Sequence, residues 1–175
     1  LSTVFTDSVR DPANDRTYFS DMGPVSNEVR SLAFDDQGTL LCGTWGSGAS
    51  VWDRAAWTHY RYSSGLGSDY VSAVAFDVDR NKWFGLQPYT PEGMPGGSSV
   101  LNNTSGITAW ASYTSTLPSP YVFCVVPASV VTDGERLDLV WIGTDQGAAV
   151  INHGGASFPS ADGLSVTYTM SDGLG

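Results

Sequence analysis

Two aspartates and an asparagine near the middle of the chain have a spacing that could bind a metal ion. Asp77, Asp79 and Asn81 follow the D-x-D-x-N pattern with which many calcium loops begin, because alternate residues can direct oxygen atoms inward. The glycine and the distal bidentate glutamate of an EF-hand loop are missing from this stretch. The equivalent stretch of an earlier repeat, 35–38 (DDQG), has the composition of a hairpin turn. We therefore expect a turn at 77–81, with calcium binding as the weaker alternative.

The other residues that could do chemistry are isolated in the sequence. His59 falls in an aromatic stretch and His153 in a glycine-rich one, and neither has a carboxylate or nucleophile at a spacing typical of catalysis. Cys42 and Cys124 lie in apolar stretches, so we expect two buried free thiols, with a disulfide as the alternative. We predict no cofactor, and neither metal-dependent nor nucleophilic catalysis.

The composition argues against two classes of partner. The 175 residues carry a net charge of −10 at pH 7, and Lys82 is the only lysine, so DNA, RNA and anionic lipid surfaces would be repelled. No apolar run approaches the roughly 20 residues that a membrane-spanning helix needs. We expect a folded chain with no nucleic-acid partner and no membrane span.

An internal repeat supplies the elements that would position these residues. Residues 29–35 (VRSLAFD) recur 42 positions later as 71–77 (VSAVAFD), and a third copy begins at 122–125 (VFCV). Each copy is followed by a related segment, which reads LCGT at 41–44, WFGL at 83–86 and WIGT at 141–144. The separation is 12 residues in the first two copies and 19 in the third, so seven residues have been inserted around 132–137.

Each repeat continues with a short apolar stretch and then an aromatic one. Four strands in about 42 residues are typical of one blade of a β-propeller. We therefore predict an all-β propeller of four-stranded antiparallel blades at about 25–67, 68–118 and 119–172, with three blades present. Segment 1–24 is predicted to hold the outer strand of a preceding blade, at 16–19, and a linker. The propeller would be partial, as a fragment of a longer chain, or closed by association of copies through open blade edges.

The three repeats also make predictions about packing. We expect Trp83 and Trp141 to be buried at equivalent positions. We expect Gly43, Gly85 and Gly143 to be sites where strands or blades approach too closely for a side chain.

The residues that carry this repeat resemble the two-component regulator propeller repeat. The resembling features are the valine, the aspartate six residues later, the tryptophan–apolar–glycine–threonine segment, and the glycine–leucine turn before the next valine. Leu41 replaces the usual tryptophan in the first copy, and the third lacks the aspartate. The resemblance implies a sensor domain outside the cytoplasm, periplasmic or secreted, that forms part of a larger sensor or assembly.

The second repeat has an insertion, at 87–97, that indicates where a ligand would bind. In a propeller the loops between strands two and three share a rim with the connections between blades, and ligands commonly bind there. Aromatic platforms with a few polar groups suit sugars, other small amphipathic ligands or a protein partner. The candidate ligand-binding residues are Trp45, Tyr70, Tyr89, Glu92, Met94, Tyr121 and Asp145.

Three functions remain open at this point. The first is a non-catalytic ligand-sensing or protein-interaction propeller, and the second is part of a polysaccharide-active lyase or hydrolase. The third is a structural subunit whose open blade edges drive assembly. The insertion at 87–97 could also be a surface loop without a ligand.

Overall fold

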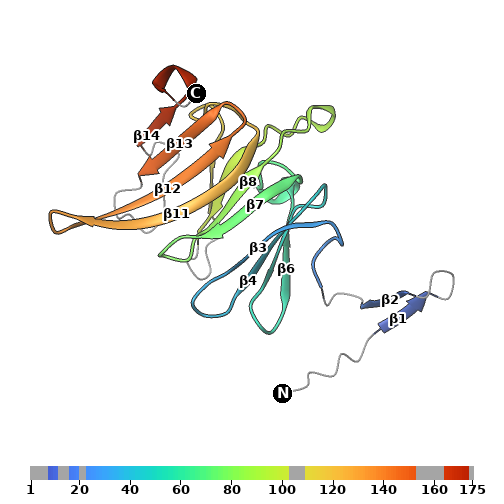
Figure 1. The fold of residues 1–175 in the computed structure, drawn as a ribbon. Coiled ribbons are helices and arrows are strands. Elements are labelled where there is room, and N and C mark those ends of the chain that lie inside the picture. Colours follow the sequence, from blue (N-terminus) through green and yellow to red (C-terminus); the bar gives the residue numbers. More distant parts are fainter. Residues whose placement is uncertain (1–7, 12–15, 20–22, 103–108, 153–163, 174–175) are drawn as a thin grey trace.

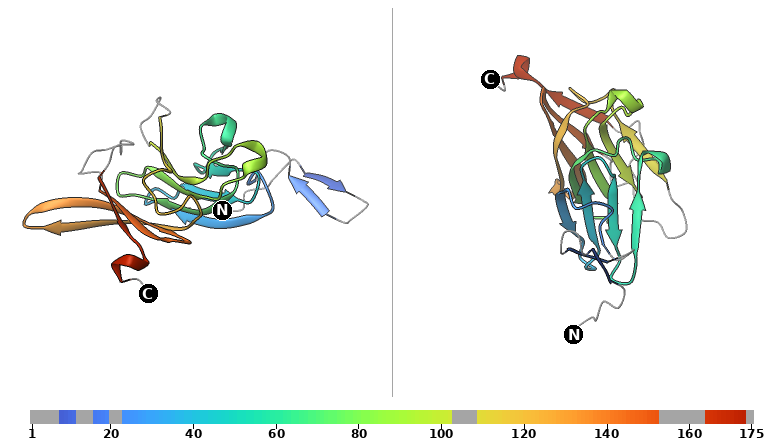
Figure 2. Two further views of the ribbon diagram at one scale, coloured as in Figure 1. Left: turned by 90° about the horizontal axis from the view of Figure 1, so that it is seen from above. Right: turned by 90° about the vertical axis from the view of Figure 1, so that its right-hand side faces the viewer.

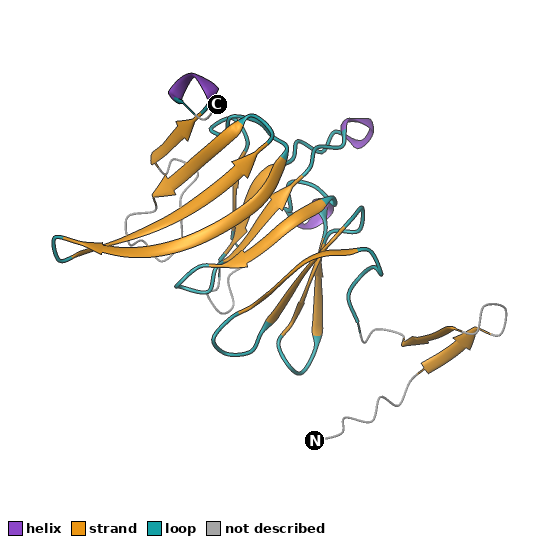
Figure 3. Ribbon diagram, in the orientation of Figure 1, coloured by secondary structure: helices purple, strands orange, loops and turns teal. Residues whose placement is uncertain are grey.

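The computed structural model describes residues 8–11, 16–19, 23–102, 109–152 and 164–173, and most of the described strands form three four-stranded antiparallel sheets (Figures 1 and 3). The first sheet contains β3 (Val29–Phe34), β4 (Leu40–Thr44), β5 (Ala49–Trp52) and β6 (Trp57–Tyr60). The second contains β7 (Val71–Phe76), β8 (Lys82–Leu86), β9 (Gly97–Leu101) and β10 (Trp110–Tyr113), and the third contains β11 (Val122–Thr132), β12 (Glu135–Thr144), β13 (Gly147–Asn152) and β14 (Leu164–Tyr168). The all-β class and the four strands per repeat are confirmed. None of the described sheets is closed.

The remaining elements are short. A separate two-stranded sheet pairs β1 (Ser8–Asp11) with β2 (Arg16–Phe19), so a strand does occupy the predicted segment 16–19. Three single-turn 3₁₀ helices are η1 (Tyr62–Ser64), η2 (Thr90–Glu92) and η3 (Met170–Asp172). Each of them ends at a glycine in the left-handed region, with φ of 108°, 69° and 93° at Gly65, Gly93 and Gly173.

Within each four-stranded sheet, neighbouring strands are also neighbours along the chain, and a short turn joins the first two strands of each. In the turn after β3, Oδ1 of Asp35 accepts hydrogen bonds from the backbone amides of Gln37 and Thr39, at 2.9 and 2.7 Å. Burial works to raise the pKa of Asp35, but hydrogen bonds, first from Thr39 and then from Gln37, outweigh it and lower the pKa overall. The carboxylate is thus held ionised as an acceptor within the turn.

The insertion in the third repeat lengthens two strands and leaves the repeat intact. β11 has 11 residues and β12 has 10, and they pair without interruption from Cys124 to the two-residue turn at Asp133 and Gly134. Both turn residues have positive φ, as a tight hairpin requires. Figure 2 shows this hairpin extending beyond the neighbouring sheets.

The core lies between the sheets, and two of the three predicted glycines, Gly43 and Gly85, mark where sheets meet. Gly143 does not, because a Cβ atom there would contact only Sγ of Cys124 on the neighbouring strand of its own sheet. A Cβ atom at Gly43 would lie 2.6 Å from Cγ1 of Val71, and one at Gly85 would lie 2.7 Å from Cγ1 of Val122. We call the face that carries this glycine the glycine face of its sheet. The opposite face, which carries Val71 in the second sheet and Val122 in the third, is the valine face. The glycine face of the first sheet therefore packs on the valine face of the second, and the glycine face of the second packs on the valine face of the third.

Two tryptophans that are equivalent in the repeat differ in burial. Trp83 on the second sheet is fully buried and stacks on Tyr113, with ring centroids 5.8 Å apart. Trp141 stacks in the same way on Tyr168 at 5.9 Å, but 41% of its surface is exposed. The expectation that Trp141 is buried was wrong. Among the described residues, no further sheet covers the glycine face that carries it.

The two cysteines are both free, which rules out the disulfide alternative in this structure. Cys42 is buried, and desolvation raises the pKa of its thiol to about 11. Cys124 is exposed, so the prediction of burial was wrong for this residue. Neither thiol faces another described sheet, but Cys42 pairs with Ser50, whose hydroxyl accepts from the amide of Val25, so the segment before β3 lies over this part of the first sheet. Cys124 pairs with Gly143 on the outer face of the third sheet.

Candidate ligand-binding site

Each of the three sheets has a β-bulge at the same point of the repeat. The register between the first two strands shifts at Val29/Ser31, at Val71/Ala73 and at Val122/Cys124. The residues left out of the pairing are Arg30, Ser72 and Phe123. A bulge leaves one residue unpaired and redirects its side chain, which is why bulges are frequent next to functional sites.

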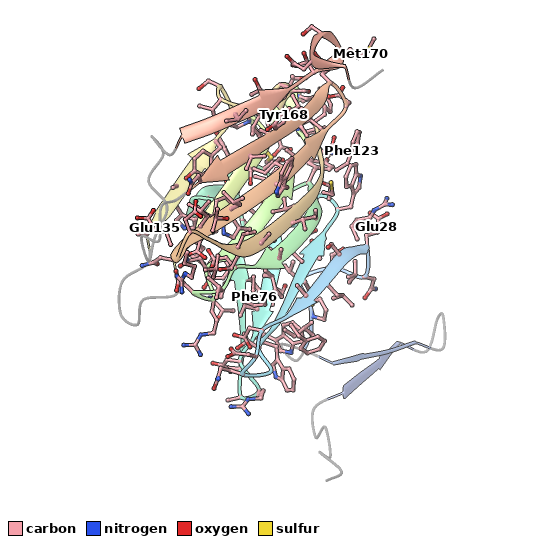
Figure 4. All side chains as sticks on the ribbon, turned by 60° about the vertical axis from the view of Figure 1, so that its left-hand side comes forward. Glu28, Phe76, Phe123, Glu135, Tyr168 and Met170 are labelled. Carbon is pink, nitrogen blue, oxygen red and sulfur yellow. The ribbon has the colours of Figure 1, made fainter. Side chains whose placement is uncertain are left out.

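The three bulge residues converge on one hollow. A cavity of about 340 Å³ is lined by Arg30, Trp45, Ser72, Gln87 and Phe123. Figure 4 shows Phe123 projecting from the surface, and 58% of its side chain is exposed. The sequence predictions included Trp45 but missed the other four lining residues. The signal that could have found three of them is the second position of each first strand, where the side-chain types differ most between repeats.

A repeated hydrogen bond places three further residues at one end of the sheets, which we call the rim. The amide that follows the second strand donates to a carbonyl just before the first strand in every sheet. The pairs are Trp45 to Glu28 at 3.0 Å, Gln87 to Tyr70 at 2.9 Å and Asp145 to Tyr121 at 3.3 Å. Trp45 and Asp145 are therefore equivalent as donors, Tyr70 and Tyr121 are equivalent as acceptors, and all four residues lie on the rim, where the sequence analysis expected them.

The rim loops are also joined from sheet to sheet. The amide of Gly48, just before the third strand of the first sheet, donates to the carbonyl of Asp69 at 2.8 Å. The amide of Gly97, in the same position of the second sheet, donates to the carbonyl of Pro120 at 2.8 Å. The loops between strands two and three thus share the rim with the connections between sheets.

Three of the predicted aromatic residues form a continuous cluster beside the hollow. The rings of Trp45 and Tyr70 meet edge to face with centroids 5.3 Å apart, and those of Tyr70 and Tyr89 lie 4.8 Å apart. The guanidinium of Arg30 lies 5.0 Å from the centroid of the Trp45 ring, within cation–π range. The cluster joins the 87–97 insertion to the first sheet.

The charge around this cluster is divided between its two ends. Desolvation raises the pKa of Tyr70, and the neighbouring Tyr89, Glu92 and Asp69 raise it further. At the other end, Arg30 lies 3.9 Å from the exposed carboxylate of Glu28. The site therefore offers an aromatic surface with the Arg30–Glu28 pair at one end and the carboxylates of Glu92 and Asp69 at the other.

The remaining predicted residues have different surroundings. Met94 is 5% exposed, and its sulfur accepts hydrogen bonds from the amide of Asp69 at 3.4 Å and the hydroxyl of Ser68 at 3.7 Å. Met94 therefore attaches the insertion to the segment that precedes β7. Glu92 is exposed at the end of η2, and Tyr121 and Asp145 are exposed on the rim beside the third sheet.

Two lining residues also connect the second sheet to the third. The carbonyl oxygen of Val122 accepts hydrogen bonds from the side-chain amide of Gln87 and from the hydroxyl of Ser72. Gln87 is buried, so its position is set by this contact. The floor of the hollow is consequently held rigid by the joint between two sheets.

The stretch at 77–81 forms the predicted turn. Oδ1 of Asp77 accepts from the amides of Asp79 and Asn81, at 3.0 and 2.9 Å. Oδ2 accepts from the side chains of Asn81 and Trp83, each at 2.9 Å. With four donors already satisfied by the chain, the Asp77 carboxylate serves the turn and the burial of Trp83. Within the described ranges, no group of three His, Cys, Asp or Glu residues could hold a metal ion.

His59 does not line the hollow. Nδ1 of His59 lies 2.9 Å from the hydroxyl of Ser50 on the neighbouring strand, and that hydroxyl also accepts from the amide of Val25 at 2.8 Å. His59 therefore has a local partner in the first sheet. His153 lies outside the described residues.

Comparison with protein-family models and with curated proteins found no match. Among solved structures, the chain is similar to the extracellular domain of the putative hybrid two-component system BT3049 from B. thetaiotaomicron, with a TM-score of 0.59 and 16% identity over 86% of this chain and 18% of that one. It is also similar to the extracellular domain of the putative hybrid two-component system BT4673 from the same organism, with a TM-score of 0.56 and 16% identity over 93% of this chain and 21% of that one.

The chain spans about a fifth of the length of these structures. At 16% identity, the likeness concerns the fold. In the described part of the chain, no helix has the length and apolarity to cross a membrane. What the comparisons establish is that this arrangement of three sheets also occurs within extracellular domains of putative two-component systems.

Proposed function

We propose that this chain is part of a non-catalytic, extracytoplasmic β-propeller that senses a ligand at the rim hollow. The observation that carries the proposal is the convergence of three bulge residues on one cavity. Arg30, Ser72 and Phe123 come from three different sheets, and the same irregularity in each sheet directs them to the same place. A bulge interrupts the ladder, so its recurrence at a shared cavity is better explained by a site than by packing alone.

The propeller architecture is supported by the way the sheets repeat. Every sheet has the same strand order, and the glycine face of one packs on the valine face of the next. In this proposal each sheet is a blade, with boundaries at about 25–67, 68–118 and 119–172. Where the chain forms part of a longer propeller, β2 within segment 1–24 is the outer strand of a preceding blade. The location outside the cytoplasm is supported by the similar structures, which are extracellular domains.

The chemistry of the hollow favours a sugar or another small amphipathic ligand. The aromatic faces of Trp45, Tyr70 and Tyr89 can stack on an apolar ring face, and Gln87 and Arg30 supply polar groups at its edge. The guanidinium is a fork of donors suited to a carboxylate or sulfate group. Of these candidates, we propose a short oligosaccharide with a single carboxylate, because one contact with Arg30 can offset the repulsion from a net charge of −10 only when the ligand carries little charge. Tyr121 and Asp145 would lie on the rim beyond it.

A matched pair of arginine variants tests the site. Arg30→Gln removes the cation beside Trp45, and Arg54→Gln removes a cation from the exposed turn between β5 and β6. Binding to a panel of neutral and carboxylated oligosaccharides would be measured by tryptophan fluorescence and calorimetry. We expect Arg30→Gln to weaken binding of a carboxylated oligosaccharide about tenfold or more, the loss of one charge-assisted contact. Arg54→Gln should bind as the unmodified chain does.

Trp45→Ala extends the test to the aromatic surface. We expect it to abolish binding of neutral and carboxylated sugars alike, because both need the stacking surface. Equal binding by the unmodified chain, Arg30→Gln and Trp45→Ala would show that the ligand contacts another part of the molecule.

A further inference from the structure

The two outermost sheets each present an apolar face that no other described sheet covers, although Cys42 and Ser50 on the valine face of the first sheet are buried and the amide of Val25 donates to Ser50. On the glycine face of the third sheet, Trp141 and Tyr168 are 41% and 38% exposed. On the valine face of the first sheet, Leu32 and Phe34 are 58% and 64% exposed. Figure 1 shows these two sheets on either side of the second one. Clusters of large exposed apolar side chains of this kind mark interaction surfaces.

The two internal joints of the molecule show what such faces bind. A Cβ atom at Gly43 would meet Val71 and Val74, and one at Gly85 would meet Val122 and Val125. The strand registers make Val29 and Leu32 the equivalents of these valines in the first sheet. They also make Gly143 the equivalent of Gly43 and Gly85. A Cβ atom at Gly143 would meet only Sγ of Cys124, from its own sheet.

An aromatic contact between the first and second sheets has equivalent residues on the two outermost faces, where no other described sheet contacts them. Trp110, on the valine face of the second sheet, packs edge to face on Tyr60 of the first, with centroids 5.6 Å apart. Trp57 has the place of Trp110 in the first sheet, since each pairs with the residue that ends the third strand. Tyr168 has the place of Tyr60, since each pairs with the equivalent alanine near the start of the third strand. One chain thus has a valine face on its first sheet and a glycine face on its third sheet that could pack together as the two internal pairs of faces do.

We propose that a second copy of this chain docks head to tail, with the valine face of its first sheet on the glycine face of the third sheet. Trp57 would then meet Tyr168 of the other copy, and Val29 and Leu32 would lie over its Gly143. The contact is heterologous, so it must either close or propagate. Two copies would form two such joints and bring six sheets into one ring, within the range of roughly four to eight blades that propellers use.

The proposed ring would also affect how many ligand sites each particle has. It would bring the rim hollows of two copies around one central axis, so that one particle holds two equivalent sites. The docking itself needs no ligand, and its test is independent of sugar binding.

The mass of the 175-residue chain in solution tests the proposal. Size-exclusion chromatography with light scattering should give twice the 18.6 kDa of one chain. Leu32→Glu and Trp141→Glu each place a charge in both joints and should each give a single-chain mass. Val131→Glu, at an exposed position near the tip of the β11–β12 hairpin, is the control and should remain a dimer. Circular dichroism checks that every variant retains its β content.

Mixing the two variants distinguishes a head-to-tail contact from a symmetric one. In a mixture of Leu32→Glu and Trp141→Glu, the unmodified valine face of one chain can dock on the unmodified glycine face of the other. The mixture should therefore recover a two-chain mass that neither variant forms alone. A single-chain mass for the unmodified protein at about 100 µM, a dimer that survives Trp141→Glu, or a mass that grows with concentration would overturn the two-copy ring.

Discussion

The second and third sheets carry the same aromatic pair in two different settings. Trp83 and Tyr113 stack with ring planes 18° apart, and Trp141 and Tyr168 stack with ring planes 14° apart. The first pair is covered by the third sheet, and the second pair is exposed. The local geometry is therefore a property of the repeat, while the burial is a property of the neighbouring sheet.

Burial also changes how each tryptophan is bonded. The indole N–H of Trp83 donates to Oδ2 of Asp77, a residue that is itself buried. The third repeat has Ala128 at the place of Asp77, so no carboxylate is available there for Trp141. A fully buried tryptophan needs a partner for its N–H, whereas an exposed one can use water. The aspartate of the repeat therefore accompanies the buried tryptophan.

The largest difference in the free energy of unfolding is expected between Trp83→Ala and Trp141→Ala. Trp83→Ala should lower the free energy of unfolding by about 3–5 kcal/mol, because it opens a cavity and removes one of the four hydrogen bonds donated to the buried Asp77 carboxylate. Trp141→Ala should cost roughly 1 kcal/mol, because the side chain is already partly in water. Urea unfolding followed by circular dichroism measures both. The variants should be made in the Leu32→Glu background, in which the proposed docking is blocked.

Equal losses for the two substitutions would contradict the comparison. If the ring forms, Trp141→Ala should cost more in the unmodified background than in Leu32→Glu, since the second copy covers the side chain.

A smaller difference in stability is expected when valine replaces the repeated glycine in the second or the third sheet. Gly85→Val should destabilise the chain by about 1–3 kcal/mol, because its Cβ would lie 2.7 Å from Val122 in a closed joint. Gly143→Val should cost less, since its Cβ would meet only the thiol of Cys124, on an exposed face. Urea midpoints of the two variants in the Leu32→Glu background would measure the difference. A larger loss for Gly143→Val than for Gly85→Val would show that the third sheet is covered.

The smallest expected difference is in the rates at which a thiol reagent modifies Cys42 and Cys124. Cys42 is buried with its pKa raised to about 11, so at pH 8 only roughly one thiol in a thousand is ionised, and a thiol reagent needs the thiolate. Cys124 is exposed on the glycine face of the third sheet. In the Leu32→Glu chain, Ellman's reagent should modify one thiol at least tenfold faster than the other.

Removing each thiol in turn assigns the two rates. Cys124→Ser should abolish the fast phase and Cys42→Ser should leave it unchanged. A fast phase that persists in Cys124→Ser would place the reactive thiol on the first sheet.

The repeat made much of this molecule predictable. The recurring valine, aspartate and glycine positions identify four strands per repeat, and the structure has them in the predicted order. The turn at 77–81 followed from the preference of Asp and Asn for bonding nearby amides. Among the candidate site residues, Trp45, Tyr70 and Tyr89 were predicted and do meet, because loops at equivalent places in a repeat share one rim.

Other features could not be predicted from a pattern along the chain. Arg30 and Phe123 were missed because a bulge shifts the alternation of side chains locally, and an alternating pattern is what identifies a strand. Met94 was expected on the surface of the insertion but is buried beneath it, because its sulfur accepts hydrogen bonds from the segment before β7.

The sequence by itself determined the period, the strand order and the contacts within each sheet, since paired strand residues are close along the chain, with Val122 and Thr144 the widest pair among the described strands at 22 positions. Only the tertiary structure decided which copy of each repeated residue is buried and which residues meet at the hollow. The reason is that the two faces of a sheet are covered by sheets from other repeats. Trp83 and Trp141 occupy the same place in the repeat and each stacks on a tyrosine of the fourth strand, but only Trp83 has another described sheet against it.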